Sequence, residues 1–209
     1  MPKYKLVLFD SDGTLADTLP WASAAFNQLA EKYGFNQASH ADHEAFRHLS
    51  MKEMLRRAKI PLWRLPLLVT GIRKLMAEHV HEFSLFDGIS ESLKQLSRSG
   101  VILGIVSSNS RENVSAILGS ENAALIKHFA CSASLFGKAP KLRSVLRASG
   151  VSAHEAIYIG DETRDAEAAH KVGMAYGAVA WGYHPLDMLR SQSSAEYFTQ
   201  PSEIGRKLA

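Results

Sequence analysis

The feature that most constrains the fold of this chain is a series of short, continuous apolar runs. Four are prominent, and polar or glycine-rich residues follow each one: KLVLF before Asp10, VILGIVS ending at Ser107, AIYIG ending at Gly160 and AYGAVAW ending at Trp181. A weaker run, FACSASL, covers residues 129–135. Strands that are buried on both faces, as in a parallel sheet, are apolar at successive positions. The runs therefore predict buried parallel strands.

The segments between these runs have the spacing of amphipathic helices. GISESLKQLSRSG, RENVSAILG and KLRSVLRASG are examples, and each ends at or near a glycine, which commonly terminates helices. Strands that alternate with helices form an open sheet with helices on both faces. The sequence thus predicts an α/β fold with a Rossmann-like parallel sheet.

Residues 16–84 break this alternation. Their apolar residues have helical spacing throughout, and no segment has the pattern of a strand. Pro61 and Pro66 interrupt the helical pattern. We predict a helical insertion at 16–84, with residues 1–15 and 85–209 forming the α/β core.

Composition excludes several classes of protein. The 209 residues are 46% hydrophobic and 22% charged, which is typical of one globular domain with an insertion. The net charge is only +3, and the basic residues form no stripe interleaved with aromatics, so we expect no nucleic-acid partner. The single cysteine, Cys131, excludes an internal disulfide or a cysteine-based zinc site and is interpreted as a small buried residue.

The chain also lacks the pattern of an exported or membrane protein. The N-terminal apolar run is too short for a signal peptide and is interrupted at Asp10. No apolar stretch approaches the roughly 20 residues that span a bilayer. We therefore expect a cytoplasmic protein without a membrane partner.

Polar side chains follow three of the predicted strands. In an open parallel sheet, ligands bind at the carboxyl ends of the strands, so these side chains should meet in one site. They are Asp10 and Asp12, then Ser107, Ser108 and Asn109, and finally Asp161 with Asp165 on the next helix.

The carboxylates in this set suggest a metal ion. Asp10 and Asp12 are one residue apart and point to the same side of an extended chain. Asp161 and Asp165, four residues apart, share one face of a helix. Carboxylates this close strongly perturb each other's pKa unless a cation is present, and hard oxygen ligands suit Mg²⁺. We predict Mg²⁺ as the cofactor.

Such a site would bind phosphate. Mg²⁺ would neutralise the phosphate on one side, while the Ser107 hydroxyl, backbone N–H groups and a lysine would do so on the other. Lys138, in LFGKAPK, is the preferred lysine and Lys141 is the alternative.

These residues carry a resemblance to a known family. DSDGTLADT resembles the D-x-D-G-T-L signature of the haloacid dehalogenase superfamily, and Ser107, Lys138 and GDETRD (160–165) resemble its second, third and fourth motifs. The resemblance covers nearly the whole chain. It extends to members with a helical cap after the first motif, and SSNS, FGK and AWGY are similar to the phosphoglycolate-phosphatase-like branch.

The resemblance implies a role for each matching residue. Asp10 would be the nucleophile that forms a phosphoaspartate, and Asp12 the general acid and base. Mg²⁺ would be held by Asp10, the Asp12 backbone carbonyl and Asp161, with Asp165 supporting it directly or through water. The insertion would be the cap domain.

The remaining site residues would contact phosphate. Ser107 and Lys138 would hold the transferring group, and Ser108 could take the place of Ser107. Asn109 would contact phosphate or cap a helix. Thr14 is interpreted equally well as a cap and as a phosphate neighbour.

The resemblance leaves the reaction partly open. A phosphatase of a small phosphorylated metabolite is the leading hypothesis. A phosphomutase of the same superfamily and a non-catalytic phosphate-ester-binding member are alternatives, and the protein could be a monomer or a homodimer. In the cap, Arg47 lies where relatives often carry R-x-x-G, but Ser50 replaces the glycine. Arg47 is therefore either a substrate contact or a solvated side chain.

Overall fold

The centre of the molecule is a parallel sheet of six strands. The structure is a computed structural model, and it describes residues 2–131 and 137–209. The strand order is β3-β2-β1-β4-β5-β6, with every neighbouring pair parallel. The strands are β1 (Leu6–Phe9), β2 (Ile102–Ser107), β3 (Ile126–Cys131), β4 (Ala156–Gly160), β5 (Ala175–Val179) and β6 (Glu196–Phe198). The predicted α/β fold is confirmed.

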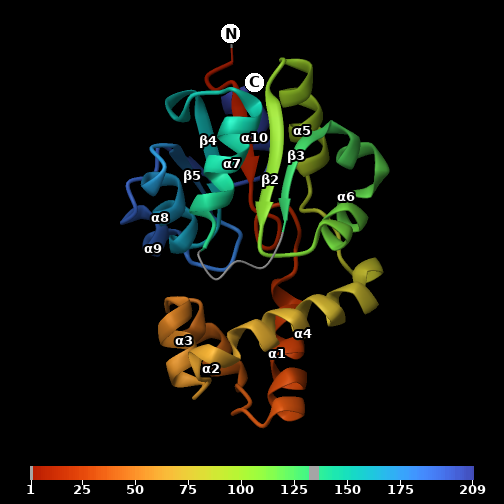
Figure 1. Ribbon diagram of the computed structural model, residues 1–209, viewed down its shortest axis with the longest axis vertical. Helices are drawn as coiled ribbons and strands as arrows, with labels where there is room; N and C mark the ends of the chain where they lie inside the picture. Colours follow the sequence, from red (N-terminus) through yellow and green to blue (C-terminus); the bar gives the residue numbers. More distant parts are fainter. Residues whose placement is uncertain (1, 132–136) are drawn as a thin grey trace.

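Helices cover both faces of the sheet (Figure 1). They are α5 (Ile89–Arg98), α6 (Arg111–Leu125), α7 (Ala139–Ser149), α8 (Thr163–Lys171), α9 (Leu186–Arg190) and α10 (Ser202–Leu208). Side chains of β1 alternate between the faces. Val7 and Phe9 pack in the cluster with α5, α6 and α10, whereas Leu6 and Leu8 pack in the cluster with α7, α8 and α9. Burial on both faces explains why this strand is apolar throughout.

The strand predictions differ from the structure at two places. β3 begins at Ile126, earlier than the run FACSASL, and residues 132–135 of that run lie outside the described part of the chain. The edge strand β6 was not predicted, because three residues with only Phe198 fully buried give no apolar run.

Four α-helices lie between β1 and α5. They are α1 (Leu19–Tyr33), α2 (His40–Phe46), α3 (Met51–Arg57) and α4 (Leu65–Glu78). Figure 1 shows them as a separate group facing the carboxyl ends of the strands. They have an apolar cluster of their own, centred on Leu29, Leu55, Ala58, Ile60 and Leu68. The arrangement is consistent with a cap, and the boundaries 16–84 remain a prediction.

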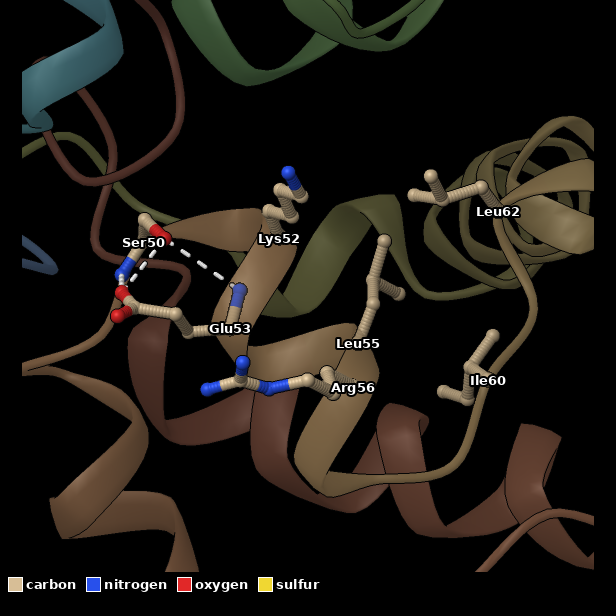
Figure 2. A pocket seen from close by; sticks show the side chains of 7 residues that line it. All are labelled: Ser50, Lys52, Glu53, Leu55, Arg56, Ile60 and Leu62. Carbon is tan, nitrogen blue, oxygen red and sulfur yellow. Dashed lines mark hydrogen bonds between the residues drawn. The ribbon is translucent and has the colours of Figure 1, made fainter.

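Ser50 has a structural role in this group of helices. It is the N-cap of α3, where its hydroxyl accepts from the Glu53 N–H and the Glu53 side chain accepts from the Ser50 N–H (Figure 2). Both residues line a surface pocket of about 570 Å³. Figure 2 shows this pocket from close by. Serine at this position is therefore explained by helix capping.

Among the described residues, none of the helices combines the length and the hydrophobicity that crossing a bilayer requires.

Candidate active site

The loop after β1 carries the first two carboxylates. The Asp10 N–H donates to the Ile159 carbonyl at 2.9 Å, and the Ser11 N–H donates to Asp10 Oδ1 at 2.8 Å. The chain then turns at Gly13, where φ is +75°. A Cβ at Gly13 would lie 2.2 Å from Asp161 Oδ2, so only glycine fits both the turn and the close approach.

Three buried carboxylates meet beside this loop. Asp10, Asp161 and Asp165 each offer an oxygen, and these oxygens all lie within 4.8 Å of one another. Burial and the Asp10 charge raise the pKa of Asp161 well above its ordinary value, and burial raises the pKa of Asp165 to about 6. A bound cation would relieve both effects, so this cluster is chemically suited to hold a metal ion.

Lys138 lies between two of these carboxylates. Its Nζ donates to Asp10 Oδ2 at 2.5 Å and to Asp165 Oδ1 at 2.6 Å, and its side chain is only 6% exposed. Burial alone would lower the pKa of Lys138, but the charges of Asp10 and Asp165 outweigh burial and raise it. The ammonium group is therefore firmly cationic.

Lys141, the alternative lysine, lies one turn further along α7. Its Nζ donates to the Ser107 carbonyl at 2.6 Å. Burial and the charge of Lys138 lower the pKa of Lys141 to about 8. Of the two lysines, the structure thus places Lys138 against Asp10.

Thr14 is buried and contacts the cluster of three carboxylates. Its Oγ1 donates to Asp161 Oδ1 at 2.7 Å, while the Tyr183 N–H donates to Asp161 Oδ2 at 2.8 Å. The residue at the start of α1 is Thr18 instead, so Thr14 does not cap that helix. Thr14 and Tyr183 together fix the orientation of the Asp161 carboxylate.

The loop after β2 approaches the site from the other side. The buried Ser107 accepts the Asn109 N–H on its Oγ at 3.0 Å, and Asn109 Nδ2 contacts both carboxylate oxygens of Asp12 at 3.3 Å. The residue that caps α6 is Ser110. Burial, and then the charge of Asp10, raise the pKa of Asp12 from its ordinary value of 3.8 to about 7. The Asp12 carboxyl is thus separate from the cluster of Asp10, Asp161 and Asp165 and holds a proton more readily than an exposed aspartate.

Residues of the helical insertion reach both sides of the site. From α4, Arg73 donates to the Ser108 carbonyl, and Asn109 Nδ2 contacts Met76 Sδ at 3.5 Å. After α2, Arg47 donates to the Tyr183 carbonyl at 3.0 Å and to the Gly182 carbonyl at 3.2 Å. Arg47 is therefore bonded to the core and is not a freely solvated side chain.

Sequence reasoning missed Arg73, Met76 and Tyr183. Arg73 and Met76 lie on a helix whose apolar spacing indicates only packing. Tyr183 holds Asp161 through its backbone N–H. Because every residue except proline has this group, the residue type gives no signal for the contact. The nearby run AWGY, which contains Tyr183, was singled out, but for its similarity to a branch of a family and not for a contact.

Comparisons with known proteins agree with one another. The sequence profile of a family described as haloacid dehalogenase-like hydrolase matches residues 7–179. A phosphoglycolate phosphatase from Synechococcus elongatus is 31% identical over 95% of this chain and 94% of its own length. The pyrophosphatase PpaX from Bacillus cereus is 25% identical over 86% of this chain and 84% of its own length. A haloacid dehalogenase-like family hydrolase from Streptococcus pneumoniae has the same fold, with a TM-score of 0.81, 21% identity and 97% of each chain covered.

Proposed function

Because the chain belongs to the haloacid dehalogenase-like hydrolase family and is a phosphatase of that family, we propose that it hydrolyses a small phosphate monoester of the phosphoglycolate type with Mg²⁺. The observation that carries the proposal is the contact of Asp10 with Lys138 beside Asp161 and Asp165, at the carboxyl ends of β1 and β4. The proposed nucleophile, the Lys138 ammonium group and the proposed metal ligands thus lie close together at the edge of the sheet where parallel sheets bind ligands, which supports the proposal.

The metal site is proposed on the chemistry of the donors. Asp10, Asp161 and Asp165 would hold Mg²⁺, with the Asp12 backbone carbonyl as a further ligand. Mg²⁺ would supply charge neutralisation of the phosphate oxygens. Asp161 is already oriented by Thr14 and Tyr183, so little reorganisation is required of it.

In the first step, a carboxylate oxygen of Asp10 attacks phosphorus and the bond from phosphorus to the leaving oxygen breaks. A carboxylate is repelled by a phosphate dianion, so positive charge must offset this repulsion. Lys138 supplies it next to Asp10 Oδ2. Ser107 would donate its hydroxyl proton to a phosphate oxygen.

Asp12 would move the protons. Burial raises the pKa of Asp12 and so favours its protonated form, which can donate its proton to the leaving oxygen. The resulting carboxylate would then take a proton from the water that attacks the phosphoaspartate, which releases phosphate and regenerates Asp10. Asn109 orients Asp12 for both steps.

A direct test is phosphate release from p-nitrophenyl phosphate. The wild-type protein with Mg²⁺ should be active, and both EDTA and Asp10→Asn should lower the rate by about 10³-fold or more, since the nucleophile or its cation is removed. Equal rates in all three samples would contradict the mechanism.

The substrate is tested separately with a panel of phosphate compounds. We expect kcat/KM for 2-phosphoglycolate to exceed the values for a sugar phosphate, a nucleotide and inorganic pyrophosphate. If pyrophosphate or another ester is preferred, the phosphoglycolate assignment fails while the phosphatase mechanism stands. Transfer of the phosphate to a second position of the substrate, without release, would identify a phosphomutase.

A further inference from the structure

A short segment of the core, Gly182 to His184, lies directly against the carboxylate of Asp161. The Tyr183 N–H donates to Asp161 Oδ2 at 2.8 Å, and the His184 N–H donates to the Asp161 carbonyl at 3.2 Å. A Cβ at Gly182 would lie 2.2 Å from the Asp161 Cβ. Any shift of this segment therefore shifts the Asp161 carboxylate.

The other side of the same segment is bonded to the helical insertion. Arg47 Nε and Nη2 donate to the Tyr183 and Gly182 carbonyls, at 3.0 and 3.2 Å. The buried His184 ring is bonded to the Leu49 backbone, and its Nδ1 accepts the Thr163 N–H at 3.1 Å. The segment is thus held between residues 47–49 of the insertion and Asp161 of the core.

We propose that Arg47 is a positioning residue for the metal site. It holds the 182–184 segment, which in turn holds the Asp161 carboxylate, and it does not touch the substrate. The inference rests on the proposed function in one respect, namely that Asp161 binds Mg²⁺. The guanidinium is planar and donates to two successive carbonyls, which fixes the peptide between them more firmly than one bond would. That peptide carries the N–H that holds Asp161 Oδ2.

Two consequences follow. Contact of Arg47 with the 182–184 segment raises the affinity of the proposed site for Mg²⁺. By linkage, bound Mg²⁺ favours the arrangement in which the insertion makes this contact, by the same factor. The short hydrogen bonds of the guanidinium go to the core, because Nε and Nη2 donate to core carbonyls at 3.0 and 3.2 Å while Nη1 lies 3.6 Å from Glu44, so in this arrangement Arg47 is directed at the core and not at a substrate.

The test measures Mg²⁺ binding to the metal-free protein by calorimetry, without substrate. Arg47→Ala should weaken Mg²⁺ binding by roughly 5- to 20-fold. This is within the range seen when a residue that orients a metal ligand, without touching the metal, is replaced. Arg47→Lys, which keeps the charge but loses the paired donors, should be nearly as weak. Arg57→Ala is the matched control, because that arginine contacts Asp42 and Phe46 within the insertion. It should bind Mg²⁺ like the wild type.

The outcomes separate the alternatives. Unchanged Mg²⁺ affinity in Arg47→Ala together with a raised KM for substrate would overturn the proposal and make Arg47 a substrate contact. Equal weakening in Arg57→Ala would overturn it in favour of general loosening of the insertion. If Arg47→Ala does not fold, judged by circular dichroism without metal, Arg47→Lys decides the question. A wild-type protein that binds no Mg²⁺ would overturn the proposed metal-dependent function as well, whereas the other outcomes leave that function intact.

Discussion

The strand ends of the core and the helical insertion contribute to the same site in different ways. In the core, Asp10, Asp161, Asp165 and Lys138 are almost fully buried. Lys138 donates to Asp10 and Asp165, and Asp161 accepts from Thr14 and the Tyr183 N–H. The insertion has its own small apolar cluster, reaches the site by a few polar contacts, and leaves Trp63 72% exposed. Buried charge is therefore concentrated at the strand ends, whereas the insertion is stabilised by ordinary apolar packing.

The largest effect on stability is expected from Lys138→Met. The substitution leaves Asp10 and Asp165 buried without their cation, and removing one partner of a buried ion pair costs about 3–5 kcal/mol. Urea denaturation of the metal-free protein at pH 8 measures this loss. Added Mg²⁺ should restore part of it, because the cation replaces the missing positive charge. If the metal-free variant is as stable as the metal-free wild type, Lys138 does not offset repulsion between the buried carboxylates, and the prediction is wrong.

A smaller loss is expected from Leu55→Ala in the insertion. Leu55 is 2% exposed, and truncation of a buried leucine costs about 2–5 kcal/mol, with the low end expected in a small cluster that can collapse. Trp63→Ala is the matched control at an exposed site and should change stability by less than about 0.5 kcal/mol. Thermal unfolding of both variants checks the contrast. A large loss for Trp63→Ala would mean that its ring is buried in an assembly.

The smallest effect, and one of opposite sign, is expected from Asp12→Asn. The folded pKa of Asp12 is raised from 3.8 to about 7, so the unfolded chain loses this proton first and the carboxyl costs stability progressively from pH 4 to 7. In EDTA at pH 8, Asp12→Asn should raise the melting midpoint by roughly 2–4 °C, equivalent to ~1 kcal/mol, which is well below the ~4 kcal/mol that this change in pKa would give for a fully buried carboxyl, because Asp12 is partly exposed and water screens its charge. At pH 4 the gain should vanish. Its phosphatase rate should nevertheless fall by ~10²–10⁴-fold. A midpoint below that of the wild type at pH 8 would contradict the raised pKa.

Much of the site could be predicted from the sequence because strand ends are easily located. Continuous apolar runs place Asp10, Ser107 and Asp161 at the ends of three neighbouring strands, and the sheet aligns those ends. The short edge strand β6 escaped prediction because it has no such run. The choice of Lys138 over Lys141 depends on its resemblance to the third motif of the family, since spacing along α7 does not fix which ammonium group reaches Asp10.

The α/β order and the position of the carboxylates at the strand ends follow from the sequence, because hydrophobic periodicity and strand length are local properties. Tertiary structure alone decided that Thr14 and the Tyr183 N–H orient Asp161, and that Arg47 meets carbonyls 135 and 136 residues away. Such contacts depend on the paths of loops and on backbone groups that every residue carries. Residue type and spacing therefore contain no signal for them until the chain is folded.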